Sequence, residues 1–560
     1  MNTKQFIYAL PFIVTAIVYG FALRIPVMDI DAGQYSALAY YVYKGNNWLH
    51  FYEGSAPYLD KPPLLFWLSA LSYKAFGVSY AAYKLPSLVA WLFGIYAIYR
   101  FALLWYDQKI AYHSALVAAT SLAGFMMVND VRTDTLLTAA IAVALWQLSE
   151  WVQAVQFGDN RRRWRALFGA SAAITAAMLA KGPIGAVVPL AAVGGHLLFT
   201  QKAKLILEID VLVAIALVLV GLSPMLYGLY TQYDLHPELL VNGERGVSGV
   251  KFYFWTQSFG RITGENKWAN KTDPFFFVHT LIWTFLPWGL FIYFALYQRV
   301  RQYLSTRKGE LISVIGVLFP LVALSFSHYK LPHYIYVALP SGSILVAWFL
   351  VSWRRGAFSA VFTRGVAVLS FIAAVVMVLA GAALVYLDFP SRFILLIATL
   401  LLAIIGLLEY FSFILYKRVF IQLIIGILFV NLILALHLYP KLLRYQSATT
   451  AGEYVRQLHL QVPFYSDGWE TAAFTVAYQQ TAPILFNIER IDSVFATLPK
   501  AYLLTSDYHI AELRAKNYTV TPVKTFYEYP ITHLSRAFMN PATRQSVLTR
   551  RELVCVEKKR

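Results

Sequence analysis

Long apolar blocks are the feature that most limits what this chain can fold into. Hydrophobic residues make up 59% of its 560 residues and charged residues only 14%, and the apolar residues stand in continuous blocks. A helix needs ~20 such residues to cross the hydrocarbon core of a bilayer, where backbone polar groups must pair internally. We therefore predict a polytopic α-helical membrane protein with about thirteen transmembrane helices. The predicted spans are 5–25, 82–105, 110–128, 135–155, 166–180, 183–200, 207–229, 275–297, 311–327, 333–352, 362–387, 391–416 and 419–438.

Positive charge gathers on one side of these predicted spans. The gaps after the even-numbered spans, among them "GDNRRRWR", "QKAK" and "QRVRQYLSTRKGE", are basic and almost free of acids. Basic loops remain in the cytoplasm, so the N-terminus is predicted to lie inside and the C-terminus outside. The net charge of +18 thus reflects membrane orientation and gives no reason to expect a nucleic-acid partner.

The last part of the chain has a different character. After residue 439, the strand-like runs "VPFYSD", "APILFN", "AYLLTSD" and "VTPVKTFYEY" are separated by the helix-like runs "TAAFTVAYQQ" and "SVFATLPK". We therefore divide the chain into a transmembrane domain, residues 1–439, and a small α/β domain outside the membrane, residues 440–560. The lone cysteine, Cys555, excludes an internal disulfide in this domain.

Two of the outside loops are long, at residues 26–81 and 230–274, and loops of this length commonly carry function. The first contains "DAGQYSALAYYVYKG" and "PPLLFWLSALSYKAFG", which have helical patterning but are too short to cross a membrane. Both are rich in aromatic residues. We predict two helices that lie in the plane of the membrane interface.

Titratable side chains concentrate in the outside gaps, in the motifs "DAGQY", "YLDKPP", "VRTD", "AKGP" and "SHYKLPHY". An enzyme that works at the outer face of a membrane gathers such groups there, whereas a transporter buries them near the midplane within broken helices. The centres of the predicted spans are largely uncharged, which favours an enzyme. A transporter or flippase for a lipid or a lipid-linked glycan remains the alternative.

These motifs, in this order and with "LPWGL" at 286–290, resemble those of a known family of bacterial lipid-linked-sugar transferases. The family holds the protein O-mannosyltransferases and the lipid A aminoarabinose transferases, which are GT-C glycosyltransferases. The resemblance implies a multi-pass enzyme of the bacterial inner membrane with its C-terminal domain in the periplasm. Its donor would be a sugar on a polyprenyl phosphate such as undecaprenyl phosphate. The acceptor would be lipid A, another envelope glycolipid or a protein hydroxyl, and a glycan polymerase or ligase of similar fold is a further alternative.

The resemblance also implies roles for individual residues. Asp31 and Asp60 occupy catalytic positions, with Asp31 as a base or an orienter of the acceptor. The cations expected to hold the donor phosphate are Lys61, Arg261 and Lys330. When the sugar leaves, the prenyl phosphate gains negative charge. Cations beside that phosphate therefore stabilise the transition state more than they stabilise the bound donor. Further candidates in the same gaps are Asp134, Lys181, Tyr334, Glu265 and His328.

Each of these residues also has a structural interpretation. Asp31 could cap the helix that follows it. Asp60 and Lys61 could form an exposed ion pair, held at the membrane rim by Pro62 and Pro63. Asp134 could pair with Arg132 or act as a cap. Lysine and tyrosine are typical interface anchors, which applies to Lys330 and Tyr334, and His328 is typical of a hydrogen-bonded interface residue.

The loop around Arg261 departs from the family pattern. In the aminoarabinose branch an acid and a histidine precede this arginine, but this chain has "QSFG" at 257–260. The change removes a zinc ligand and argues against a bound metal, so no cofactor is expected to be required, although a divalent metal stays an open alternative. Glu265 could supply a replacement acid. The sequence names neither the sugar nor the acceptor.

Overall fold

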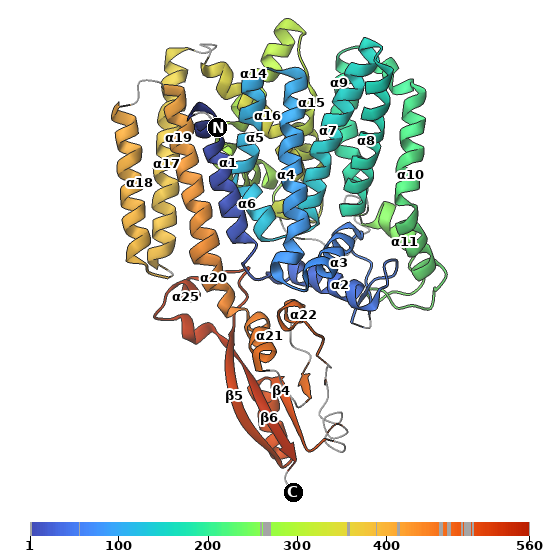
Figure 1. Cartoon of the computed structure of the whole chain (residues 1–560), viewed down its shortest axis with the longest axis vertical. Coiled ribbons are helices and arrows are strands. Elements are labelled where there is room, and N and C mark those ends of the chain that lie inside the picture. Colours follow the sequence, from blue (N-terminus) through green and yellow to red (C-terminus); the bar gives the residue numbers. More distant parts are fainter. Residues whose placement is uncertain are drawn as a thin grey trace.

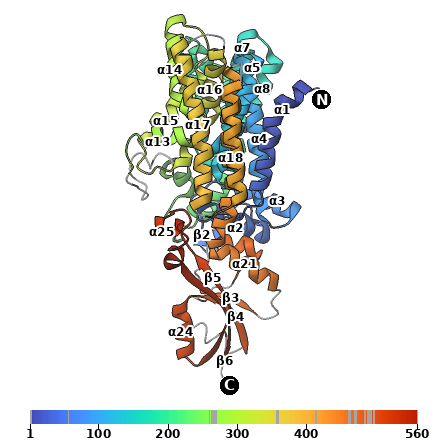
Figure 2. The ribbon, with the colours of Figure 1, turned by 90° about the vertical axis from the view of Figure 1, so that its left-hand side faces the viewer.

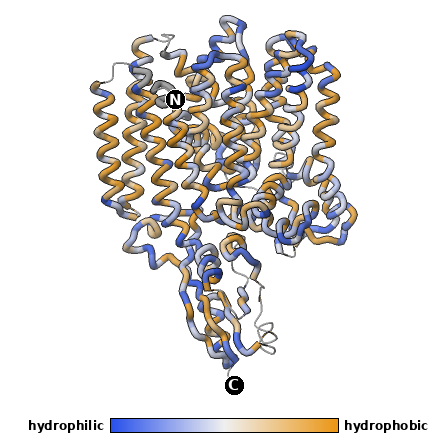
Figure 3. The backbone as a smooth tube through the Cα atoms, viewed as in Figure 1, coloured by the Kyte–Doolittle hydropathy of each residue, from blue (hydrophilic) through white to orange (hydrophobic). Residues whose placement is uncertain are grey.

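The computed structural model describes residues 3–558 except 55, 258–259, 261–269, 271, 355–358, 388, 412–414, 459–462, 468–471, 483–484, 486–493 and 495–497. It consists of a bundle of long helices with a smaller domain at one end (Figure 1). The bundle is apolar along most of its length, and polar residues gather at its two ends and in the smaller domain (Figure 3).

Every apolar range predicted as a span contains a helix or a bent pair of helices. In chain order these are α1 (Thr3–Ala22), α4 (Tyr80–Trp105), α5 (Gln108–Thr120) with α6 (Leu122–Asn129), α7 (Thr133–Phe157), α8 (Asn160–Lys181), α9 (Ile184–Phe199), α10 (Ile209–Leu229), α13 (Phe276–Thr284) with α14 (Gly289–Thr306), α15 (Ile312–Ser325), η4 (Pro332–Ala338) with α16 (Leu339–Arg354), α17 (Ala360–Leu387), α18 (Arg392–Phe411), and α19 (Leu415–Ile433) with η5 (Leu434–Leu438).

Length and composition qualify seven helices of the described residues as membrane spans, or nine if each of the two bent pairs counts as one span. α1, α9 and α15 are shorter apolar helices. The polytopic helical class is therefore confirmed, while the total of about thirteen spans remains a prediction.

The helices differ in how much of their surface the protein itself covers. The span formed by η4 and α16 is 94% buried, so it lies in the middle of the bundle, whereas the α18 span is only 11% buried. An α-helix that is apolar on every side needs an apolar environment on every side. α18 therefore depends on lipid for most of its covering, and Figure 1 shows it at the edge of the bundle.

The first long loop forms α2 (Asp31–Gly45) and α3 (Leu64–Phe76), joined through the short hairpin β1 (Tyr52–Glu53) and β2 (Ala56–Pro57). Both predicted helices of this loop are present. They lie beneath the bundle, on the side of the smaller domain (Figure 1). The second long loop contains the helical turns η2 (Tyr230–Asp234), α11 (Gly249–Lys251) and η3 (Phe252–Thr256).

The smaller domain projects from the bundle as an elongated body that ends near the C-terminus (Figure 2). Its sheet has the order β3-β4-β6-β5, with β3 (Phe464–Ser466) parallel to β4 (Lys500–Thr505). The strand β6 (Thr549–Lys558) is antiparallel to both of its neighbours, β4 and β5 (Tyr518–Glu528). β6 lies in no run that was predicted as a strand. Four of the six residues of "APILFN" and four of the eight residues of "SVFATLPK" lie outside the described residues.

Short helices complete this domain and link it to the bundle. They are α20 (Tyr439–Leu442), η6 (Leu443–Tyr445), α21 (Ser447–Leu458), α22 (Ala473–Tyr478), α24 (Asp507–Ala515), α25 (Arg536–Met539) and η7 (Arg544–Val547). Several hydrogen bonds join the domain to the first long loop and α4, and two of them come from tyrosine hydroxyls. The Tyr80 hydroxyl donates to Glu453 at 2.8 Å, and the Tyr40 hydroxyl donates to the Gln479 carbonyl oxygen at 3.1 Å.

The close packing of α9 on α8 can be tested at Gly185. A Cβ atom at this position would overlap the main-chain carbonyl group of Ala177. Gly185→Ala should therefore lower stability by about 1–3 kcal/mol, the usual cost of forcing extra atoms into a packed contact. The measurement is thermal unfolding of the detergent-solubilised protein. Gly194→Ala on the same helix is the control, since a Cβ there meets nothing within 4 Å; equal stability of the two variants would contradict this packing.

Candidate functional site

Asp31 lies at the first position of α2, where its carboxylate forms an ion pair. Arg132 Nη1 donates to Asp31 Oδ2 at 2.6 Å, and Arg132 Nε donates to Asp130 Oδ2 at 2.9 Å. The capping residue of α2 is Ile30, so the interpretation of Asp31 as a helix cap is wrong. The Asp31 side chain keeps 34% of its surface exposed, which leaves its carboxylate reachable by a ligand.

Asp134 and Lys181 form a second ion pair close to the same end of the bundle. Lys181 Nζ lies 2.5 Å from Asp134 Oδ1, and the two side chains are only 14% and 4% exposed. His333 Nε2 lies 3.8 Å from the other carboxylate oxygen. The Lys181 ammonium also lies 4.3 Å from the centre of the Tyr334 ring. The alternative pairing of Asp134 with Arg132 is therefore wrong, because Arg132 bonds to Asp31 and Asp130.

An apolar cavity of about 190 Å³ opens beside this second pair. Its walls come mainly from α7, α9, α15 and η4, with Val187, Phe319 and Leu324 among them. Lys61, Asp134, Lys181 and Tyr334 also line it. The structure thus brings four of the predicted site residues, from four separate segments, into one cavity.

A smaller cavity of about 20 Å³ adjoins Asp60, and Lys61, Lys181 and Gln257 line both cavities. The Asp60 carbonyl oxygen accepts a hydrogen bond from Gln257 Nε2 and lies 3.4 Å from Lys61 Nζ. The Asp60 carboxylate faces Asn242, whose Nδ2 lies 3.5 Å from Oδ1. A single water needs ~10–15 Å³, so the space at Asp60 holds little more than one water molecule.

Two buried tyrosines lie between the acidic residues. Tyr35 and Tyr58 each pack with a ring-centre distance of 5.9 Å on Phe66. Burial, followed by the charges of Asp60, Glu53 and Asp31, raises the pKa of the Tyr58 phenol well above its ordinary value. Tyr58 therefore stays protonated, and among the described residues its hydroxyl has no hydrogen-bond partner. No sequence pattern pointed to Tyr58 beyond its place two residues before Asp60.

The remaining predicted residues have other surroundings. Lys330 is buried, donates from Nζ to the Asp273 carbonyl oxygen at 3.0 Å, and is not among the residues that line the 190 Å³ cavity. Its backbone N–H donates to Asn270 Oδ1 at 2.9 Å. The His328 carbonyl oxygen accepts from the Asn270 N–H at 3.1 Å. Arg261 and Glu265 lie outside the described residues.

Metal binding was left open by the sequence. Within the part of the chain that the structure describes, no three His, Cys, Asp or Glu side chains gather into a group able to hold a metal ion.

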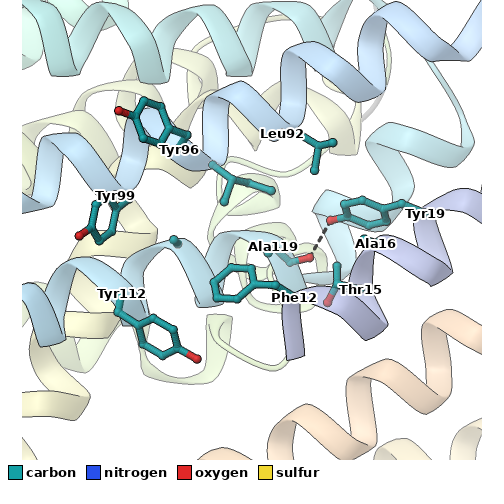
Figure 4. Close-up of a pocket in the computed structure, with 11 residues that line it drawn as sticks. Phe12, Thr15, Ala16, Tyr19, Leu92, Tyr96, Tyr99, Tyr112 and Ala119 are labelled. Carbon is teal, nitrogen blue, oxygen red and sulfur yellow. Dashed lines mark hydrogen bonds between the residues drawn. The ribbon is translucent and has the colours of Figure 1, made fainter. Parts of the chain in front are cut away.

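A third cavity, of about 480 Å³, lies among α1, α4 and α5 (Figure 4). Its lining includes Phe12, Leu92, Tyr96 and Tyr112, and the Tyr19 hydroxyl beside it donates to the Ala119 carbonyl oxygen at 2.6 Å. None of its lining residues is charged. The cavity suits hydrocarbon, and its lining offers no ionised side chain to pair with a phosphate.

The fold and the cluster at one end of the bundle define a class, the multi-pass membrane proteins of the GT-C fold. The structure superposes on the crystal structure of ArnT from Cupriavidus metallidurans in the apo state with a TM-score of 0.72 at 17% sequence identity. The match covers 99% of this chain and 98% of that one. The structure of the same protein bound to undecaprenyl phosphate gives a TM-score of 0.71 with the same identity and coverage.

Sequence comparisons point the same way. Residues 60–227 match the dolichyl-phosphate-mannose-protein mannosyltransferase family. The chain is 26% identical over 331 residues to an undecaprenyl phosphate-alpha-4-amino-4-deoxy-L-arabinose arabinosyl transferase of Pseudomonas aeruginosa (strain UCBPP-PA14). That alignment covers 58% of this chain and 56% of the relative, so the chain spans just over half the length of the curated relatives that it matches. These matches confirm the resemblance stated from the motifs, and the structural match shows the fold.

The role of the Asp134–Lys181 pair in stability can be tested by removing either partner. Asp134→Leu leaves an ammonium with little exposure, and Lys181→Met leaves a buried carboxylate, so each should cost roughly 3 kcal/mol. The double variant should lose less than the sum of the two, because no uncompensated charge remains. Thermal unfolding of the three purified variants measures this coupling. Strictly additive losses would show that the two side chains do not interact.

Proposed function

We propose that this protein is a glycosyltransferase that moves a sugar from a polyprenyl-phosphate donor to an acceptor at the outer face of the membrane. The acceptor is an envelope glycolipid such as lipid A, or a protein hydroxyl. The names of the matching proteins support the donor class, since the curated relatives are arabinosyl transferases of undecaprenyl phosphate-linked sugar. A transporter or flippase is not favoured, because the named relatives are transferases.

The observation that carries this proposal is the cavity of about 190 Å³ with two ammonium groups in its lining. Its aliphatic walls suit a prenyl chain, and Lys61 and Lys181 suit the phosphate to which that chain is attached. Tyr334 lies against Lys181 and can donate a hydrogen bond to the same phosphate. A ligand with a long apolar part and one anionic group matches this combination.

The proposed reaction exchanges one bond for another at the sugar. The bond from C1 to the phosphate oxygen breaks, and a bond from C1 to the acceptor oxygen forms. The departing prenyl phosphate carries more negative charge than the donor did. One cation at ~4 Å and an effective dielectric constant of ~20 gains roughly 4 kcal/mol from one such charge, or about 10³ in rate. We assign this stabilisation of the departing phosphate to Lys61 and Lys181. We also assign it to Arg261, because of the sequence motif in which Arg261 stands.

We assign Asp31 as the base that takes the proton when the acceptor is a hydroxyl group. When the acceptor is already ionised, Asp31 only orients it. A positioned base contributes ~10²–10⁴ in rate. Arg132 holds its carboxylate in place through the 2.6 Å ion pair. Asp60 lines the smaller cavity together with Lys61, and we assign it to support of the reaction centre. Lys330 has a main-chain partner at Asp273 and is assigned to holding the rim of the site.

The proposed orientation follows from the distribution of charge. The chain is a multi-pass membrane protein, and we place the N-terminus in the cytoplasm and residues 440–560 in the periplasm of a bacterial inner membrane. Basic loops such as 159–165 lie at the end of the bundle opposite to this domain, which supports the assignment (Figure 1).

The role of Asp31 is tested by Asp31→Asn, which keeps the shape of the side chain and removes the base. Sugar transfer with a hydroxyl acceptor should fall by about 10²–10⁴, while binding of the polyprenyl-phosphate donor is retained. The measurements are the transfer rate in proteoliposomes and mass spectrometry of the envelope lipids and proteins of cells that carry either form. A variant that transfers sugar at a rate close to wild type would remove Asp31 from the mechanism.

The role of Lys61 is tested by Lys61→Ala. Because the variant loses a cation next to the proposed phosphate position, donor affinity should fall by about tenfold or more, equivalent to at least 1.4 kcal/mol. Lys74→Ala is the control, since Lys74 is an exposed lysine on α3 in the same loop. Donor binding is measured with undecaprenyl phosphate in detergent. Equal affinities of the two variants would place the phosphate elsewhere.

A further inference from the structure

The segment between α1 and α2 carries Asp31 but has no regular structure of its own. It runs from residue 23 to residue 30, and Asp31 follows it directly at the start of α2. The position of the Asp31 carboxylate therefore depends on what holds these few residues. Two of the hydrogen bonds that hold them come from a residue more than 400 positions further along the chain.

Gln446, at the junction between the bundle and the C-terminal domain, bonds this segment at two points. Its Oε1 accepts from the Asp29 N–H at 2.9 Å, and its Nε2 donates to the Val27 carbonyl oxygen at 2.9 Å. The Gln446 side chain is 2% exposed, and its Nε2 also lies 2.5 Å from the Thr449 hydroxyl. The amide thus uses its acceptor and both of its donor hydrogens in a buried setting.

This pairing is specific to an amide side chain. A planar group with one acceptor and one donor on the same edge matches the N–H and C=O of residues two apart on an extended segment, as a neighbouring β-strand would. Removal of this buried amide would leave the Asp29 N–H and the Val27 carbonyl oxygen without their hydrogen bonds. A buried main-chain group that is left unsatisfied costs more free energy than one hydrogen bond contributes. Gln446 therefore fixes the backbone two residues before Asp31.

The same domain makes a second contact close to this segment, at Gly33. The first turn of α2 packs on α22 at Gly33, where a Cβ atom would lie 3.2 Å from the Ala473 nitrogen and would also overlap the Asp29 carboxylate. The Asp29 backbone is thus held by Gln446, and its side chain is enclosed between Gly33 and α22. There is little space for the segment to shift.

We infer that Gln446 is a positioning residue through which the C-terminal domain sets the place of the Asp31 carboxylate. This inference rests on the proposed function of Asp31. The domain then has a role in the transfer reaction itself, in addition to any contact that it makes with the acceptor. Without these two hydrogen bonds, Asp31 would occupy a wider range of positions.

Gln446→Met tests this, because methionine keeps the length of the side chain and removes its hydrogen bonds. We expect kcat to fall about ten- to a hundredfold, the scale of a misplaced catalytic group, with the KM for the donor unchanged. Amide hydrogen exchange in peptides that cover residues 26–33 should become faster. If the methionine variant is not recovered folded, Gln446→Glu is measured in the same way, since it keeps the oxygen that accepts from the Asp29 N–H and replaces the donor nitrogen with a second acceptor oxygen that faces the Val27 carbonyl oxygen.

Tyr80→Phe is the matched control, because it removes another hydrogen bond between the bundle and the C-terminal domain, the one from Tyr80 to Glu453. It should leave kcat and the exchange of residues 26–33 at wild-type values. A merely structural role of Gln446 predicts equal effects of the two variants, and that result would overturn the inference.

A double variant separates this inference from the proposed function. In an Asp31→Asn background, Gln446→Met should cost no further activity, because the carboxylate that it positions is already absent. Full activity of Asp31→Asn would refute the role of Asp31. Impaired Asp31→Asn together with normal kcat for Gln446→Met would leave the role of Asp31 intact and refute the role of Gln446. If the activity losses of the two single changes multiply in the double variant, Gln446 does not act through Asp31, and the inference is refuted.

Discussion

The site depends on one constraint, which is that ionised side chains at the edge of a hydrocarbon layer must be paired. Moving an isolated carboxylate or ammonium out of water costs several kcal/mol, and only a close partner offsets this. The pairs of Asp134 with Lys181 and of Asp31 with Arg132 meet this requirement across separate segments. Pairing therefore fixes how α2, the α6–α7 connection and the end of α8 lie relative to one another.

The same pairing limits how the site can bind an anion. The described cluster contains the carboxylates of Asp31, Asp60, Asp130 and Asp134, with Glu53 nearby, and these outnumber the cations Lys61, Arg132 and Lys181. An added phosphate must therefore share a lysine with an existing acid or draw on a further cation. Lys61 and Lys181 line both cavities of the site, so both ammonium groups are placed to take part in the proposed binding of the phosphate.

The elements of the fold could be predicted from the sequence, whereas the partners of its charged residues could not. Apolar blocks located every long helix, and α2 begins at Asp31 as its motif suggested. Four of the residues that line the 190 Å³ cavity, Lys61, Asp134, Lys181 and Tyr334, stood in the predicted motifs. Arg132, however, is two residues from Asp134 in sequence and yet bonds to Asp31, because a helix that starts at Thr133 points neighbouring side chains apart. Gln446 stands 417 residues from its partner Asp29, and no local pattern reports such a contact.

The two cavities at the site differ in a way that bears on the proposed reaction. The larger has room for part of a prenyl phosphate, but the space at Asp60 has room for about one water molecule. A sugar between Asp31 and Asp60 must therefore displace what now fills that space. Tyr58, which lines this space, packs on Phe66, whereas Asn242 reaches the Asp60 carboxylate only at 3.5 Å and adjoins Gly243 in a left-handed conformation. A long hydrogen bond is weak, so the contact with Asn242 is the easier of the two to displace.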